Sequence, residues 1–206
     1  SFTVWPNPFS PNSDGRKDNT TIKASFTETI SWTLEAKNST NHLVRKWTGT
    51  GTSLNITWNG KDSNNVIVTD GTYKIVLSGK SATTGILLAW NGTKTVTVDT
   101  TPPTITNIRA DPNPFDPPSQ TTTISYTLSE PCNVQIRIFD SKNKLVRNLL
   151  NWTNQPAGLN SVIWDGKDNY GSIVLPGTYT VKIWVVDKAG NRAAPYPNTT
   201  LKITVT

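Results

Sequence analysis

The sequence predicts an all-β protein built from two similar domains, and three observations support this prediction. Short β-branched and aromatic runs are separated by Gly or Pro at intervals of roughly 8–12 residues, which is typical of short strands joined by turns. The pentapeptide Trp-Asx-Gly-Lys-Asp occurs twice, beginning at Trp58 and at Trp164, which lie 106 residues apart. The chain has 206 residues, enough for two domains that each bury a core.

The repeat extends on both sides of the pentapeptide. Seven residues after each copy comes Asp-Gly-Thr-Tyr or Pro-Gly-Thr-Tyr, ending at Tyr73 and at Tyr179. Pro-Asn-Pro-Phe precedes the copies, at Pro6 and at Pro112. Self-similarity at a fixed offset predicts two like-built units, and two prolines between them predict a short, stiff linker. The predicted divisions are a domain at 1–99, a linker at 100–103 and a domain at 104–206.

In the first domain, strands are expected where apolar and polar residues alternate, because one face of a half-buried strand points inward. Pro6–Pro11 is expected to form an edge segment, since proline lacks the N–H that a central strand needs. Asn12–Gly15 is a turn signal, and Asn91-Gly92 is a hairpin signal after the apolar run Ile86–Trp90. The expected strands are Phe2–Trp5, Ile22–Phe26, Ile30–Leu34, Leu43–Trp47, Leu54–Trp58, Tyr73–Leu77 and Val96–Val98.

The second domain repeats this order. We expect Ile124–Leu128 to match Ile22–Phe26, and Val134–Ile138 to match Ile30–Leu34. Tyr179–Val185 is expected to be the longest alternating strand. About seven short strands in roughly 100 residues predict an immunoglobulin-like β-sandwich for each unit, with Trp58 and Trp164 buried near one end. The remaining expected segments are Ile105–Ile108, Leu145–Arg147, Val162–Trp164, a turn at Asp187–Asn191, and Leu201–Val205.

The repeated motif resembles the Ig-like domain family named for the flagellar hook-capping protein (FlgD-type). The resemblance covers nearly all of both units and is best over 112–191; the first unit lacks the Asp187–Asn191 turn. It implies an Ig-like fold, no catalytic residues, and tandem modules of secreted enzymes or surface proteins. The hook-capping role itself is not expected, because that protein's N-terminal hook-binding region has no counterpart here. The motif residues are Trp58, Gly60, Asp62, Tyr73, Trp164, Gly166, Asp168 and Tyr179.

Charge and composition indicate the partners and the cellular location to expect for this protein. The net charge is +6, but Lys and Arg are scattered, so a solubilising surface is expected and not a nucleic-acid partner. The chain has a single cysteine, so it cannot form an intrachain disulfide. It contains no apolar stretch of about 18 residues, so no membrane-spanning helix is predicted. A chain that starts at Ser1 without Met is expected to be a processed, exported protein. We therefore expect an extracellular, cell-surface location.

Few residues are suited to catalysis or to binding a metal. His42 is the only histidine and is expected in a solvated loop, while Cys132 is in phase with inward positions. Asp14 and Asp18 resemble part of a calcium loop, but no Glu stands at its twelfth position. Asx-turn hydrogen bonding is the expected role of these residues. We expect no cofactor and no enzyme, since no nucleophile–base pair can be assembled.

Six Asn-x-Ser/Thr sequons make a glycoprotein conceivable, although a sequence so rich in Asn and Thr produces several by chance. Asn55 lies between inward-facing Leu54 and Ile56, so its side chain is expected to face solvent. The sequons begin at Asn19, Asn38, Asn55, Asn91, Asn151 and Asn198.

The leading functional prediction is a non-enzymatic extracellular structural or adhesive protein, a subunit of a surface filament or array. Its partners would be copies of itself or other surface proteins. The first unit has no counterpart of Thr104–Thr106, and an incomplete sheet edge recruits a strand from another chain. Such a head-to-tail contact propagates. The candidate contact residues are Phe2, Val4, Trp5 and Trp184.

The alternative is a glycan-binding accessory module of a larger secreted enzyme or adhesin. The eight tryptophans of the chain suggest glycan binding, because indole rings stack on the faces of sugars. Trp152 or Trp184 would bind the glycan. Among the tryptophans, Trp5, Trp90, Trp152 and Trp184 are expected outside the two cores.

Overall fold

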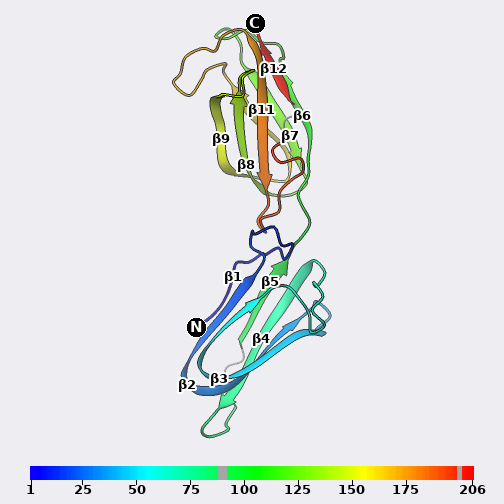
Figure 1. Ribbon diagram of the computed structural model, residues 1–206, viewed down its shortest axis with the longest axis vertical. Helices are drawn as coiled ribbons and strands as arrows, with labels where there is room; N and C mark the ends of the chain where they lie inside the picture. Colours follow the sequence, from blue (N-terminus) through cyan, green and yellow to red (C-terminus); the bar gives the residue numbers. More distant parts are fainter. Residues whose placement is uncertain (88–91, 199–200) are drawn as a thin grey trace. The chain divides into compact units, whose positions relative to one another are not determined.

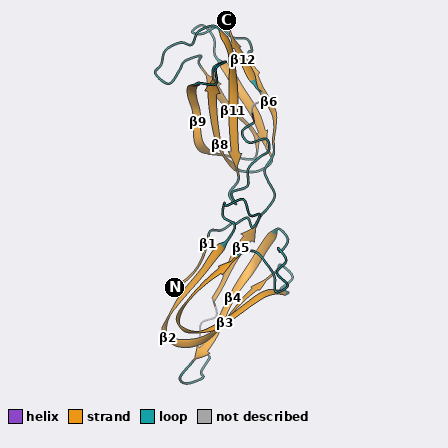
Figure 2. Ribbon diagram, in the orientation of Figure 1, coloured by secondary structure: helices purple, strands orange, loops and turns teal. Residues whose placement is uncertain are grey.

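The computed structural model describes residues 1–87, 92–198 and 201–206. The chain divides into two compact units, Ser1–Thr101 (unit 1) and Pro102–Thr206 (unit 2), so the division falls inside the segment expected as a linker. The regular elements in these ranges are strands (Figure 2), which confirms the all-β fold class. Within the same ranges, no helix is long and apolar enough to cross a membrane.

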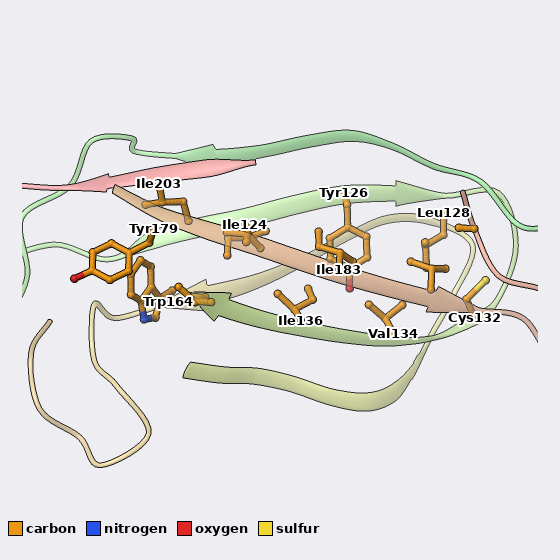
Figure 3. Packing of buried hydrophobic residues seen from close by; sticks show 14 of the residues in the cluster. Ile124, Tyr126, Leu128, Cys132, Val134, Ile136, Trp164, Tyr179, Ile183 and Ile203 are labelled. Carbon is orange, nitrogen blue, oxygen red and sulfur yellow. The ribbon is translucent and has the colours of Figure 1, made fainter. Parts of the chain in front are cut away.

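Unit 2 is a sandwich of two antiparallel sheets (Figure 1). The three-stranded sheet has the order β10-β7-β6 and the four-stranded sheet the order β12-β11-β8-β9. Their apolar faces meet in one core, where Ile124 and Tyr126 of β7 pack with Ile136 and Ile183 of the other sheet (Figure 3). The bounds are β6 Ile105–Asp111, β7 Thr122–Leu128, β8 Cys132–Phe139, β9 Leu145–Gln155, β10 Gly158–Trp164, β11 Gly177–Val186 and β12 Lys202–Val205.

Unit 1 has the same layers, built from fewer and longer strands. The first part of β2 pairs with β1 and the end of β3, and its second part pairs with the start of β3 and with β4. The two strands thus run from one layer into the other, and Figure 1 shows them strongly curved. The bounds are β1 Phe2–Trp5, β2 Thr20–Lys37, β3 Leu43–Trp58, β4 Gly71–Ser81 and β5 Gly92–Val98.

The continuity of β2 and β3 differs from the separate short strands expected from the sequence. In unit 2 the corresponding crossings are broken by Pro131 and Pro156, which cannot donate to a ladder. Unit 1 has Thr29 in place of Pro131, so β2 continues, with a register shift between Ser25 and Ile30. With 18 residues, β2 is longer than β11, which has 10 and was expected to be the longest alternating strand.

The register also corrects the expected match between the units. Trp32 pairs with Gly79 on β4, and Val134 pairs with Val185 at the equivalent place on β11. Val134 is therefore the counterpart of Trp32, not of Ile30. The large ring fits because Gly49 lies on its other side; a Cβ at Gly49 would lie 2.3 Å from the indole. A tryptophan flanked by two glycines thus replaces a layer of medium-sized side chains.

Candidate functional site around the repeated loops

Each pentapeptide tryptophan is buried at one end of its sandwich, as expected, and its polar atom is satisfied locally. Trp58 Nε1 donates to the carbonyl of Lys61 at 2.9 Å, and Trp164 Nε1 donates to that of Lys167 at 3.0 Å. The rings meet Tyr73 and Tyr179 edge to face, with centroids 5.5 and 5.4 Å apart. These indoles close the cores and are not available to a ligand.

Two features require a glycine at the third position of the pentapeptide: its backbone conformation and the close packing of a proline ring. Gly60 and Gly166 have φ of 68° and 72°, a region that favours glycine. A Cβ at either position would lie 2.5 Å from the ring of Pro11 or Pro117. The proline-rich segment therefore packs directly on the pentapeptide turn, which explains why the two motifs are repeated together.

The motif aspartate organises the loop that follows it. One carboxylate oxygen of Asp168 accepts hydrogen bonds from the N–H groups of Tyr170 and Ser172, at 2.8 and 2.9 Å. Its carbonyl accepts a hydrogen bond from Arg147 at 2.6 Å. In unit 1, Asp62 and Arg45 make the same set of contacts. The carboxylates of Asp62 and Asp168 thus stabilise the turn through Asx-type hydrogen bonds.

The motif tyrosine ties the end of the loop to its own strand. Tyr73 and Tyr179 each donate from the hydroxyl to the backbone carbonyl four residues earlier, at 2.7 Å. Burial, and secondarily the charge of Asp140, raises the pKa of Tyr179. Tyr179 is therefore a structural donor at neutral pH.

The residue that precedes the Gly-Thr-Tyr sequence differs between the two repeats. Where unit 2 has Pro176, unit 1 has Asp70, and its carboxylate holds the start of the linker. Thr100 donates to it from the backbone N–H at 3.0 Å and from the hydroxyl at 2.8 Å, and the Thr101 hydroxyl donates at 2.8 Å. The motif loop of unit 1 thereby fixes the last residues of that unit.

The loop of unit 2 borders an open groove of about 480 Å³ with an apolar rim. Tyr170 and Leu175 stand out from the loop with 93% and 80% of their surface exposed, and Ile173 and Leu145 complete the rim. The repeat places Asn64 and Thr69 of unit 1 where unit 2 has Tyr170 and Leu175. Periodicity could not find Tyr170, Ile173 and Leu175, because these three residues lie in an irregular loop.

A second groove, of about 630 Å³, lies on unit 1 and was also missed from the sequence. Outward Thr33 and Ser78 face each other across β2 and β4, where unit 2 has Gln135 and Trp184. Small side chains leave the hollow open in unit 1, whereas Trp184 fills the same place in unit 2. The available signal was the alternation of Ser and Thr on three neighbouring strands. The groove is lined by Ser31, Trp32, Thr33, Thr48, Gly49, Thr50, Ser78, Gly79, Lys80 and Leu87.

The residues predicted as subunit contacts differ in how much of their surface is exposed. Phe2 retains only 7% of its surface and belongs to the core of unit 1, which corrects its expected role; Val4 is half-buried against that core. Trp5 is 75% exposed on the edge strand β1. Trp184, on β11 of unit 2, is half-buried, with the Arg137 guanidinium 5.5 Å and the Phe139 ring centroid 6.5 Å from its own ring centroid.

The other candidate residues have local roles. Asp14 and Asp18 accept hydrogen bonds from the N–H groups of Arg16 and Gly15, which are the turn hydrogen bonds expected of them. His42 is exposed in a turn. Cys132 is buried in the core of unit 2, where burial first and the charge of Glu130 second raise its thiol pKa to about 12.

The sequons differ in accessibility. Asn55 is exposed on the outer face of β3, as expected, and Asn19 and Asn151 are also exposed. Asn38 is half-buried, and its side-chain oxygen accepts hydrogen bonds within the 38–42 turn. Asn198 is buried, which corrects its place among the sites open to modification. Asn91, like Trp90, lies outside the described residues.

Fold and loops together define an immunoglobulin-like β-sandwich protein. Residues 116–189 match the family model of the FlgD Ig-like domain, so the resemblance found in the motifs is confirmed for this part of unit 2. No curated protein matches the sequence.

Three solved structures are similar over the whole chain at low identity. They are the fibronectin(III)-like modules of Clostridium thermocellum CbhA (13% identity, TM-score 0.48, 94% of that chain), the human OSCAR ligand-binding domain (12%, 0.40, 94%) and dimeric latent PorU from Porphyromonas gingivalis (11%, 0.36, 20%). The chain thus spans a fifth of the length of PorU.

Proposed function

We propose that the chain is a non-enzymatic extracellular structural or adhesive protein, and that it forms part of a surface filament or array through contacts with copies of itself or with other surface proteins. The observation that supports this proposal is the division of roles between polar and large apolar side chains. The polar groups of the repeated motif hold the loops, while large apolar side chains are presented to solvent. Tyr170 and Leu175 beside the groove of unit 2, and Trp5 on β1, are the main examples.

Exposed aromatic and aliphatic side chains on a fixed backbone suit protein contact. The carboxylate of Asp168 accepts hydrogen bonds from the backbone N–H groups of Tyr170 and Ser172, which hold the loop that presents Tyr170 and Leu175. A contact surface ordered before binding loses little conformational entropy on association. Apolar residues around a groove are typical of interaction sites, and aromatic anchors contribute most of the affinity in many interfaces.

Sedimentation of the full chain over a range of concentrations tests the proposal. We expect concentration-dependent assembly beyond a dimer, reduced at least about tenfold in the double variant Tyr170→Ser/Leu175→Ser because the apolar rim is lost. The matched control is Asn64→Ser/Thr69→Ser at the equivalent positions of unit 1, which should assemble like the wild type. Unchanged assembly in the unit 2 variant would rule out this rim as the contact.

The groove of unit 1 favours a second function, that of a glycan-binding accessory module. Its lining of Ser and Thr hydroxyls, with Lys80 at its border, offers donors and acceptors to sugar hydroxyls. The side chains involved are Thr33, Thr50 and Ser78, in place of Trp152 and Trp184. Glycan-array binding that is lost in Ser78→Trp, which copies Trp184 and fills the groove, would favour this alternative over assembly.

A further inference from the structure

Strand β10 is an edge of the three-stranded sheet in unit 2 that lacks the usual protection against pairing. Its residues Gly158–Trp164 pair with β7 in unbroken register and include no charged residue and no proline. Leu159 and Ile163 point away from the core with 70% and 60% of their surface exposed. An uncharged, regular edge with exposed apolar side chains is a template for another strand.

The corresponding edge strand of unit 1 has polar side chains on its outer face. The last part of β3 takes the place of β10, because Trp58 and Trp164 pair with Thr20 and Thr122. In this register Ser53 and Thr57 of unit 1 stand where unit 2 has Leu159 and Ile163. Asn55, the exposed sequon residue, stands where unit 2 has Ser161. The apolar edge is therefore specific to unit 2.

Other edges of unit 2 carry features that hinder pairing. β6 contains Arg109 and Asp111 and has a register shift between Thr106 and Arg109. β9 contains Arg147 and has three register shifts against β8. β12 has four residues, one of them Lys202. Bulges, charges and short length each discourage strand addition.

The sequence of β10 is self-complementary about Ser161. In an antiparallel pair centred on this residue, Leu159 of one strand lies opposite Ile163 of the other, and both point to the same face of the sheet. Ser161 lies opposite its own copy, and no like charges are brought together. We propose that β10 pairs with β10 of a second copy of this chain, which joins two three-stranded sheets into one six-stranded sheet.

Such a contact is isologous: it forms a closed dimer and does not propagate. It therefore goes beyond the proposed filament, which needs a contact of a different kind. Two strands of seven residues form a small interface, so we expect a weak dimer that is populated when the protein is concentrated at a surface. Failure to form filaments would not count against this dimer, and the dimer alone would not produce a filament.

Cross-linking of the full chain tests the proposal. In Ser161→Cys the new thiols of two paired strands lie opposite each other, and a short bismaleimide should join them into a covalent dimer. The matched control is Asn55→Cys, an exposed residue at the equivalent place in unit 1, which should remain largely monomeric. The native Cys132 is buried and does not interfere. Equal cross-linking of the two variants, or none in Ser161→Cys, would overturn the proposal.

A second variant keeps the test sharp. Leu159→Lys introduces a charge into the pairing edge, and lysine on an edge strand opposes pairing. Added to Ser161→Cys, it should lower the cross-linked fraction at least about fivefold, whereas Ser53→Lys in unit 1 should leave it unchanged. Circular dichroism and thermal unfolding establish that each variant is folded. Cross-linking that is indifferent to Leu159→Lys would contradict pairing through β10.

Discussion

At the scale of single residues, the repeated motif residues hold the fold. The same few contacts recur in both units: indole to carbonyl, glycine against proline, carboxylate to backbone N–H, and tyrosine to carbonyl. A motif that recurs with each copy of a fold, and whose polar atoms are satisfied within it, is explained by folding. The contacts that we propose therefore lie at residues that differ between the copies, such as Ser78, Leu159 and Tyr170.

The motif glycine of unit 2 provides a test of this explanation. Gly166→Ala places a Cβ against Pro117 and at positive φ, so we expect a loss of about 1–3 kcal/mol in the free energy of unfolding. Gly171→Ala is the control, because its φ of +85° is similar but no heavy atom lies within 4 Å of its Cβ position. It should cost only about 1 kcal/mol. Equal losses in urea denaturation would refute the close packing of proline on the turn.

The buried Tyr126 predicts a pH dependence of stability. Burial raises its pKa to about 12 from the ordinary value of 10.0, so the folded protein keeps a proton that the unfolded chain loses. This contribution is fully present below pH 10 and disappears as the pH rises from about 10 to about 12. Denaturant titrations over this range should show the free energy of unfolding of unit 2 falling with pH. The slope should be shallower in Tyr126→Phe, although Cys132 keeps part of it; an unchanged slope would count against the assignment.

At the scale of elements, the alternation of apolar residues was enough to predict the strands but not their continuity. Ile22–Phe26 and Ile30–Leu34 were each predictable, because inward residues recur every second position. That they form one strand depends on pairing with β1, β3 and β4, which no local pattern contains. The loop roles were also hidden, because Pro11 and Arg45 contact the pentapeptide from distant parts of the sequence. The groove of unit 1 forms because the outward side chains on three strands are small. A search for patterns of large apolar residues cannot detect such a groove.

The crossing from one layer to the other should accept proline where unit 2 already has it. Thr29 is exposed, and it occupies the place of Pro131 beside the register shift in β2. We expect Thr29→Pro to cost under about 1 kcal/mol of unfolding free energy. Thr33→Pro should cost about 3 kcal/mol or more, because Thr33 pairs with both β3 and β4. If chemical denaturation ranks the two variants in the reverse order, the crossing is not where the register places it.

At the scale of the whole molecule, Asp70 determines how the chain leaves unit 1. Its carboxylate accepts hydrogen bonds from Thr100 and Thr101, at the end of that unit. In Asp70→Ala we expect the Thr100 amide to exchange its hydrogen at least about tenfold faster, because its acceptor is gone. Asp70→Asn keeps one carbonyl oxygen and should lie between this variant and the wild type. Unaltered protection of Thr100 in Asp70→Ala would show that the linker is held by something else.

The two units together present a repeated structural frame with different surfaces. Unit 1 carries a hydroxyl-lined groove and an exposed Trp5, and unit 2 carries an apolar loop rim and an unprotected edge strand. Both sets of features suit contact with other molecules, and on this basis we propose that the protein is a component of an assembly. Electron microscopy of material taken from the native source tests this claim most directly. We expect filaments or a regular surface array in which this chain is a subunit, and dispersed single molecules at high concentration would contradict the proposed assembly.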